Sequence, residues 1–128
     1  MVKFGPAGNC DMFYASGFKN TYQMPEFLAS VNLDAYEVQC GRGVRMGDDA
    51  AEKLAQSAKK NNITLSVHAP YYISMSGVEE EKRLGSINYI LQSAALAKKI
   101  DAKRIVIHSG SCSKMSREQA LFLAIDTM

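Results

Sequence analysis

Three features are scarce in this 128-residue sequence: paired cysteines, long apolar runs and an excess of charge of one sign. The three cysteines are an odd number without a Cys-x-x-Cys pair, which argues against a disulfide framework. No run approaches the roughly 20 apolar residues of a membrane helix. The N-terminus, MVKFGPAGNC, lacks the apolar core of about 7–15 residues that a signal peptide needs. A net charge of +2 provides no basic tail. These absences predict a cytoplasmic protein without a membrane partner.

Short apolar segments alternate with helical patterns along the whole chain. We expect four strands, at residues 2–7, 35–41, 63–68 and 104–108, and a loop at residues 8–24. Pro25 suits the first turn of a helix, and Asp48 and Asp49 suit the positive end of the next one. The core face of that second helix is predicted as Ala51, Leu54, Ala55 and Ala58.

Two further helices are predicted from capping boxes, in which Ser76 pairs with Glu79 and Ser116 with Gln119. The first is long and ends near Ile100. Its predicted core face consists of Leu84, Ile87, Leu91, Ala94 and Ala95. The second carries Ala120, Leu121, Leu123 and Ala124 and continues to the end of the chain.

Four consecutive strand–helix units predict an α/β fold with a parallel sheet and right-handed crossovers. An open doubly wound sheet and a (β/α)₈ TIM barrel both fit this order. Four units in 128 residues average 32 residues each, and eight such units would give about 256, close to the ~250 of a TIM barrel. The chain also stops inside a helical pattern, LAIDTM. We therefore interpret residues 1–128 as the N-terminal half of a single TIM-barrel domain.

The two histidines of the chain occupy the same place in their local patterns, in ITLSVHAPYY and RIVIHSGS. Side chains alternate between the faces of a strand, so His68 and His108 fall on the mixed-polarity face, opposite Ile, Leu and Val. In a barrel this face points inward, and active sites lie at the carboxyl ends of the strands. Imidazoles on neighbouring strands, about 4.8 Å apart, could reach one metal ion at roughly 2.0–2.1 Å each.

The alternative for each histidine is a hydrogen-bonded structural residue, because a catalytic zinc site needs about three protein ligands. Glu37, an acid within a predicted strand, could orient an imidazole or form a surface ion pair.

The segments VHAPYYISMSG and VIHSGS resemble the endonuclease IV family of apurinic/apyrimidinic (AP) endonucleases, which are xylose isomerase-like TIM barrels. The resemblance implies a zinc-dependent hydrolase that cleaves double-stranded DNA on the 5′ side of abasic sites during base excision repair. It implies up to three Zn²⁺ ions in the complete site, with His68 and His108 as ligands of one of them and a glutamate from the next strand as the third ligand. Tyr71 matches a tyrosine in a DNA-recognition loop, and Arg42, with Arg45 as the alternative, matches an arginine near the DNA.

Two departures leave the substrate open. The chain has His-Ser-Gly-Ser where the family usually has His-Pro-Gly-Ser, and FGPAGN where it more often has Gly-x-His-x-Ser. One alternative is therefore a sugar isomerase or epimerase of the same superfamily. Another is a non-catalytic half-barrel that pairs with a missing C-terminal half or with another copy of the chain. No catalytic residue is assigned, and we expect the 128 residues alone to be inactive and to bind metal weakly.

Overall fold

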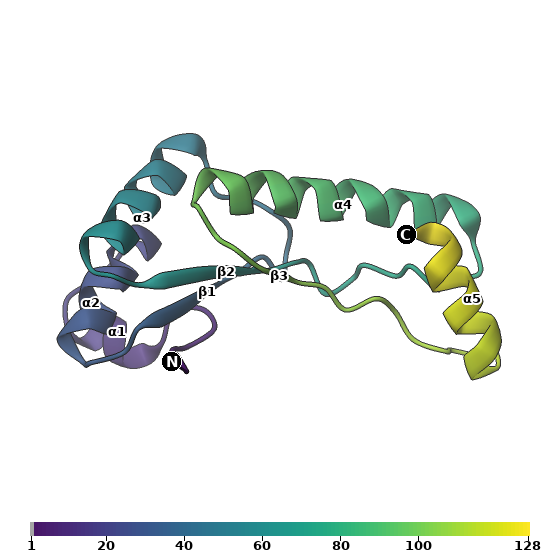
Figure 1. Cartoon of the computed structure of the whole chain (residues 1–128), viewed down its shortest axis with the longest axis horizontal. Helices are drawn as coiled ribbons and strands as arrows, with labels where there is room; N and C mark the ends of the chain where they lie inside the picture. The colour runs from purple at the N-terminus through teal and green to yellow at the C-terminus, as the bar shows by residue number, and fades with distance from the viewer. Residues whose placement is uncertain (1) are drawn as a thin grey trace.

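A computed structural model of the protein describes residues 2–128 (Figure 1). The elements are α1 (Asp11–Ala15), the 3₁₀ helix η1 (Thr21–Gln23), α2 (Met24–Ser30), β1 (Ala35–Gln39), α3 (Asp48–Lys60), β2 (Thr64–His68), α4 (Glu80–Lys99), β3 (Ile105–Val106) and α5 (Arg117–Thr127). The strands form one parallel sheet in the order β1-β2-β3. This partial parallel α/β architecture agrees with the predicted half-barrel.

The helices surround the sheet unevenly. Figure 1 shows α4 running along the length of the molecule, with α5 at the end opposite α1, α2 and α3. Within residues 2–128 no helix combines the length and the apolar character needed to cross a bilayer.

The predicted first strand, residues 2–7, lies beside β1 but does not form a regular strand. It makes a single parallel bridge, between Ala7 and Glu37. The carbonyl of Phe4 accepts hydrogen bonds of 3.0 Å from two backbone N–H groups at the start of β1. Two residues explain the irregularity. Pro6 has no N–H to donate, and Gly5 approaches β1 so closely that a Cβ atom would lie 1.6 Å from the Ala35 carbonyl oxygen.

The predicted loop at residues 8–24 contains helix α1 and the 3₁₀ helix η1, so that prediction is wrong. The reason is an aromatic cluster that orders the segment. Phe13 of α1 is fully buried. Its ring centroid lies 5.4 Å from that of Phe18, stacked, and 5.6 Å from that of Phe27 in α2, edge to face. Such pairs add stability beyond the area they bury.

The core lies on one face of the sheet. Side chains of β1 and β2 alternate, so Tyr36, Val38, Leu65 and Val67 are buried against the helices. Helix α3 meets them with Ala51, Leu54 and Ala58, as predicted, while Ala55 is half-buried.

The predicted starts of α2 and α3 are confirmed. Asp48 and Asp49 occupy the first turn of α3, as expected from the helix dipole. Pro25 lies in the first turn of α2.

The predicted core face of α4 is wrong. Leu84 and Leu91 are 52% and 60% exposed, and the buried face of α4 instead carries Arg83, Ser86, Ser93, Leu96 and Ala97. Burial of the serines is possible because each hydroxyl donates to a carbonyl one turn earlier, Ser86 to Lys82 at 3.1 Å and Ser93 to Tyr89 at 2.8 Å. Apolar periodicity could not identify this face, because three of its five buried residues are polar and are hydrogen-bonded within the protein.

One capping prediction is confirmed and the other is wrong. Ser116 and Gln119 form a reciprocal capping box at the start of α5. Helix α4 begins after Glu79, which makes no side-chain cap. The Ser76 hydroxyl donates instead to the carbonyl of Ser111, at 2.9 Å, in the loop after β3. Strand β3 is also shorter than predicted, because the chain leaves the sheet after Val106 to form this contact.

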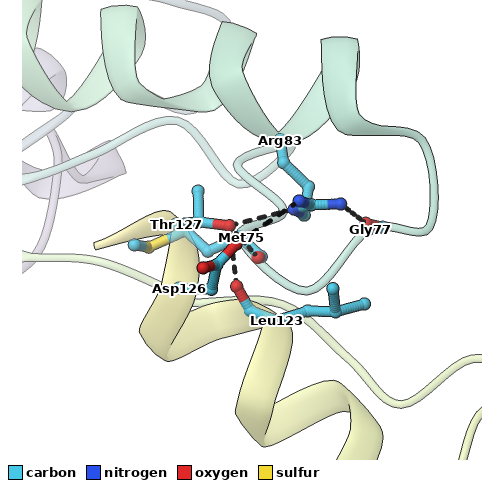
Figure 2. A network of polar contacts seen from close by, with 6 residues as sticks. All are labelled: Met75, Gly77, Arg83, Leu123, Asp126 and Thr127. Atoms are coloured by element: carbon cyan, nitrogen blue, oxygen red, sulfur yellow. Dashed lines mark hydrogen bonds and ion pairs between the residues drawn. The ribbon is translucent and has the colours of Figure 1, made fainter.

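A buried polar network joins α4 to α5 (Figure 2). Arg83, 8% exposed, donates from Nε to the Thr127 hydroxyl at 3.0 Å and from Nη1 to the Gly77 carbonyl at 3.3 Å. The Thr127 hydroxyl lies 2.9 Å from the carbonyl oxygen of Met75 and 2.7 Å from that of Leu123. Helix α5 is thereby connected to the loop that follows β2.

Candidate functional site

His68 and His108 approach each other at the carboxyl ends of β2 and β3. Their Nε2 atoms are 3.0 Å apart, the ring centroids are 4.9 Å apart and the rings are tilted by 41°. His68 is the last residue of β2 and shares a face with Thr64 and Ser66, opposite the buried Leu65 and Val67. The two predicted ligands therefore meet at one edge of the sheet, His68 at the end of β2 and His108 two residues after β3.

The surroundings of His68 fix which ring nitrogen faces its partner. Its Nδ1 lies 2.9 Å from the carbonyl oxygen of Ala69. A carbonyl can only accept a hydrogen bond, so Nδ1 of the neutral ring carries the proton and Nε2 presents a lone pair. That lone pair is directed at His108 Nε2, where it can accept a proton or bind a cation.

The spacing of the two nitrogens is compatible with one shared metal ion. Two nitrogens bound tetrahedrally at about 2.0–2.1 Å lie roughly 3.3 Å apart, close to the observed 3.0 Å. Within residues 2–128 no group of three His, Cys, Asp or Glu side chains could hold a metal ion. The described residues thus bring two imidazole nitrogens to a spacing that one metal ion could bridge.

Among the described residues, Glu37 forms no hydrogen bond or ion pair with either histidine. Its carboxylate accepts a 3.1 Å hydrogen bond from Ser66, its register partner across β1 and β2. The hydrogen bond that orients His68 comes from a backbone carbonyl instead. The residue that pairs with His68 in the register is Gln39, which is exposed at the end of β1.

Tyr71 lies three residues after His68 and is 70% exposed. Its ring contacts Tyr72 edge to face at 5.6 Å, and Tyr72 contacts Tyr89 of α4 in the same way at 4.8 Å. A Cβ atom added to Gly43 would lie 3.3 Å from the Tyr72 hydroxyl, so the loops after β1 and β2 touch at this point. Tyr71 therefore presents an open aromatic surface on a supported loop.

Arg42 and Arg45 are exposed in the loop after β1 and line a cleft of about 750 Å³. Gln39 also lines this cleft. The histidines do not line it, but the register places Gln39 beside His68. The cleft thus begins one strand away from the histidine pair, with two guanidinium groups on its wall.

Asn9 also lines the cleft and connects three hydroxyl groups. Its Oδ1 accepts a 2.8 Å hydrogen bond from the Tyr36 hydroxyl, and its Nδ2 donates to Thr21 at 3.2 Å and to Tyr14 at 3.1 Å. Burial raises the pKa of the Tyr36 phenol above its ordinary value of 10.0, which keeps the hydroxyl protonated as a donor. We did not predict Asn9 and Tyr36 as site residues. Asn9 follows the first predicted strand, whereas Tyr36 lies at the amino end of β1, where the sequence gives no signal of a site.

Comparison with known proteins supports the same fold. The model of the family described as "Xylose isomerase-like TIM barrel" matches residues 25–128. An uncharacterized protein of Methanocaldococcus jannaschii is 33% identical over 118 residues, which cover 92% of this chain and 40% of the relative. A probable endonuclease 4 of Mycoplasma pneumoniae is 30% identical over 77 residues, which cover 60% of this chain and 27% of that protein. The chain therefore spans less than half the length of these relatives.

Solved structures share the architecture at lower identity. A D-psicose 3-epimerase, solved in the presence of D-fructose, superposes with a TM-score of 0.71 at 17% identity and covers 85% of this chain and 40% of its own. Endonuclease IV from Thermus thermophilus superposes with a TM-score of 0.62 at 17% identity, over 83% of this chain and 40% of its own. These likenesses establish the barrel fold, of which this chain supplies a part.

Proposed function

Because the chain belongs to the xylose isomerase-like TIM-barrel family, we propose that it is part of a metal-dependent phosphodiester hydrolase that acts at abasic sites in DNA. One observation carries the proposal: the 3.0 Å approach of two imidazole Nε2 atoms at the carboxyl edge of the sheet. The family includes endonuclease IV-type enzymes, and the similarity to a probable endonuclease 4 supports this branch of it.

We propose that His68 and His108 hold one cation, with Zn²⁺ as the expected metal because imidazole nitrogens suit it. The Ala69 carbonyl keeps the Nε2 atom of His68 available as a ligand. When bound, the cation supplies Lewis-acid polarisation of a phosphoryl oxygen. The remaining ligands, including any for further zinc ions, would come from the part of the barrel outside this chain.

In this proposal the partner is double-stranded DNA that contains an abasic site, in the cytoplasm. The exposed ring of Tyr71 would stack in the gap left by the missing base. Arg42 would contact a phosphate, for which a planar guanidinium is well suited. Both side chains lie on loops at the carboxyl edge of the sheet, the edge at which the two histidines also meet.

A sugar epimerase is the second candidate, favoured by the higher TM-score of the D-psicose 3-epimerase. At 17% identity that likeness concerns the fold alone. The convergence of two imidazoles favours the hydrolase, because sugar isomerases of this superfamily typically hold their metal mainly with carboxylates.

The test compares His68→Ala and His108→Ala with Thr64→Ser, a conservative change on the same face of β2. In the complete protein, each histidine variant should lose zinc and incise an abasic duplex at least about 100-fold more slowly, since even outer-shell changes cost about 10–100-fold. Thr64→Ser should behave like the parent. Full zinc content and incision in His68→Ala would refute the proposal. Turnover of ketoses without incision would establish the epimerase instead.

A further inference from the structure

The sheet does not hold His108 directly. Strand β3 ends at Val106, and the last backbone hydrogen bond along this pair of strands runs from the Ala69 N–H, just after β2, to the Val106 carbonyl, at 2.9 Å. His108 lies two residues beyond this bond. Its position relative to His68 must therefore depend on what fixes the chain after it.

The chain after His108 is fixed by the loop that follows β2. The Met75 N–H donates to the Ser109 carbonyl at 2.8 Å, and the Ser76 hydroxyl donates to the Ser111 carbonyl at 2.9 Å. Ser76 is only 4% exposed, so water cannot easily replace its hydroxyl. His108 is thus held between the last bond of the sheet and the first bond of this contact between the two loops.

Gly110 lies between the two bonded carbonyls and allows the loops to approach closely. Its φ of 132° is rarely adopted by residues with a side chain. A Cβ atom at this position would lie 2.3 Å from the Ser76 hydroxyl oxygen and 3.2 Å from the Ser76 nitrogen. The absence of a side chain at Gly110 therefore leaves room for the Ser76 hydroxyl beside the carbonyl of Ser111.

The loop after β2 is itself anchored, so it can act as a fixed support. The Ser74 N–H donates to the Ser86 hydroxyl of α4 at 3.0 Å. The two neighbours of Ser76 are also held: the Met75 carbonyl lies 2.9 Å from the Thr127 hydroxyl of α5, and the Gly77 carbonyl accepts from Arg83 at 3.3 Å (Figure 2).

From these contacts we infer that Ser76 is a positioning residue for His108, and that its contact with the Gly110 loop sets the distance between the two imidazoles. The metal-binding consequence rests on the proposed function. The geometric consequence does not, because it concerns only the 3.0 Å separation of the two Nε2 atoms.

The experiment uses the 128-residue chain with two readouts: zinc affinity by competition with a chromophoric chelator, and imidazole ¹⁵N–¹H spectra without metal. Ser76→Ala removes the hydroxyl, and Ser76→Cys keeps the volume while weakening the bond. Gly110→Ala adds the clashing Cβ. Its control is Gly17→Ala, which has the same kind of backbone strain (φ 89°) but no atom within 4 Å of the new Cβ. Ser111→Ala is the second control, because it keeps the accepting carbonyl.

Ser76→Ala and Gly110→Ala should each weaken zinc binding by about tenfold or more, as loss of an outer-shell partner does. Both should shift the imidazole signals in the metal-free spectrum, whereas Gly17→Ala and Ser111→Ala should leave affinity and spectrum unchanged. The double variant Ser76→Ala/Gly110→Ala should lose less affinity than the sum of the two, since removing the hydroxyl relieves the closest clash.

The inference is wrong if folded Ser76→Ala and Ser76→Cys chains keep the parental spectrum and zinc affinity. It is also wrong if the two single effects simply add. If the parent chain binds zinc too weakly to measure, as expected of two ligands alone, the metal-free spectra decide the role of Ser76. Circular dichroism of each variant separates a changed ring geometry from loss of folding.

Discussion

Replacing Thr127 by valine should destabilise the protein strongly for a conservative change near the end of α5. Valine has the same shape but no hydroxyl, so the buried Nε of Arg83 loses its acceptor at 3.0 Å and the Met75 carbonyl loses its partner at 2.9 Å. A hydrogen bond to a charged group contributes about 1.5–3 kcal/mol, and an unsatisfied buried donor costs a similar amount. Asp126 cannot compensate, because it lies 3.8 Å from Arg83 and its side chain is 60% exposed. We therefore expect a loss of about 2–3 kcal/mol.

Urea unfolding followed by circular dichroism at 222 nm measures this loss from the shift of the midpoint at constant slope. Thr127→Ser keeps the hydroxyl and removes one methyl group, so it should cost about 0.8 kcal/mol. Asp126→Asn tests the exposed ion pair and should change stability by less than about 0.5 kcal/mol. The reasoning is refuted if Thr127→Val unfolds within 0.5 kcal/mol of the parent, or if Asp126→Asn costs as much as Thr127→Val.

Three further predictions concern the rest of the fold. Burial raises the pKa of Tyr36, so above about pH 10 the unfolded chain ionises first and the free energy of unfolding should decrease. Urea unfolding at several pH values should show a smaller decrease for Tyr36→Phe. Burial also raises the pKa of Cys40, so a disulfide reagent at pH 8 should label exposed Cys112 first and Cys40 only on unfolding. Gly5→Ala should lower the free energy of unfolding by about 1–3 kcal/mol, whereas Gly41→Ala, with open space around it, should not.

The parts of the fold that the sequence predicted correctly are those set by local alternation. In β2 the apolar Leu65 and Val67 alternate strictly with Thr64, Ser66 and His68, which places the histidine on the polar face. Helix α3 likewise has a single apolar stripe and a charged opposite side. Because neighbouring parallel strands end at the same edge, the pattern also predicted that the two histidines approach each other, although β3 ends two residues before His108.

The errors arose where a distant contact decided the local structure. Ser76 has the spacing of a helix cap, yet its hydroxyl bonds to a loop 35 residues away. The buried face of α4 contains Arg83, whose partners in α5 cannot be recognised from its neighbours in the sequence. Gly5 and Pro6 interrupt a strand pattern because of a close approach to β1. None of these contacts has a periodic signature.

The two faces of the sheet divide stability from chemistry. Every strand side chain in the main core cluster, such as Tyr36, Val38 and Leu65, lies on the face covered by helices. The opposite face carries Glu37, bonded to Ser66, and His68, whose ring reaches toward His108. The buried side chains of β2 hold the strand in place, and His68 belongs to the same strand. The core therefore positions the His68 imidazole although no core side chain contributes an atom to the histidine pair. His108 lacks this support, because its strand ends before it, and a contact between two loops must take its place.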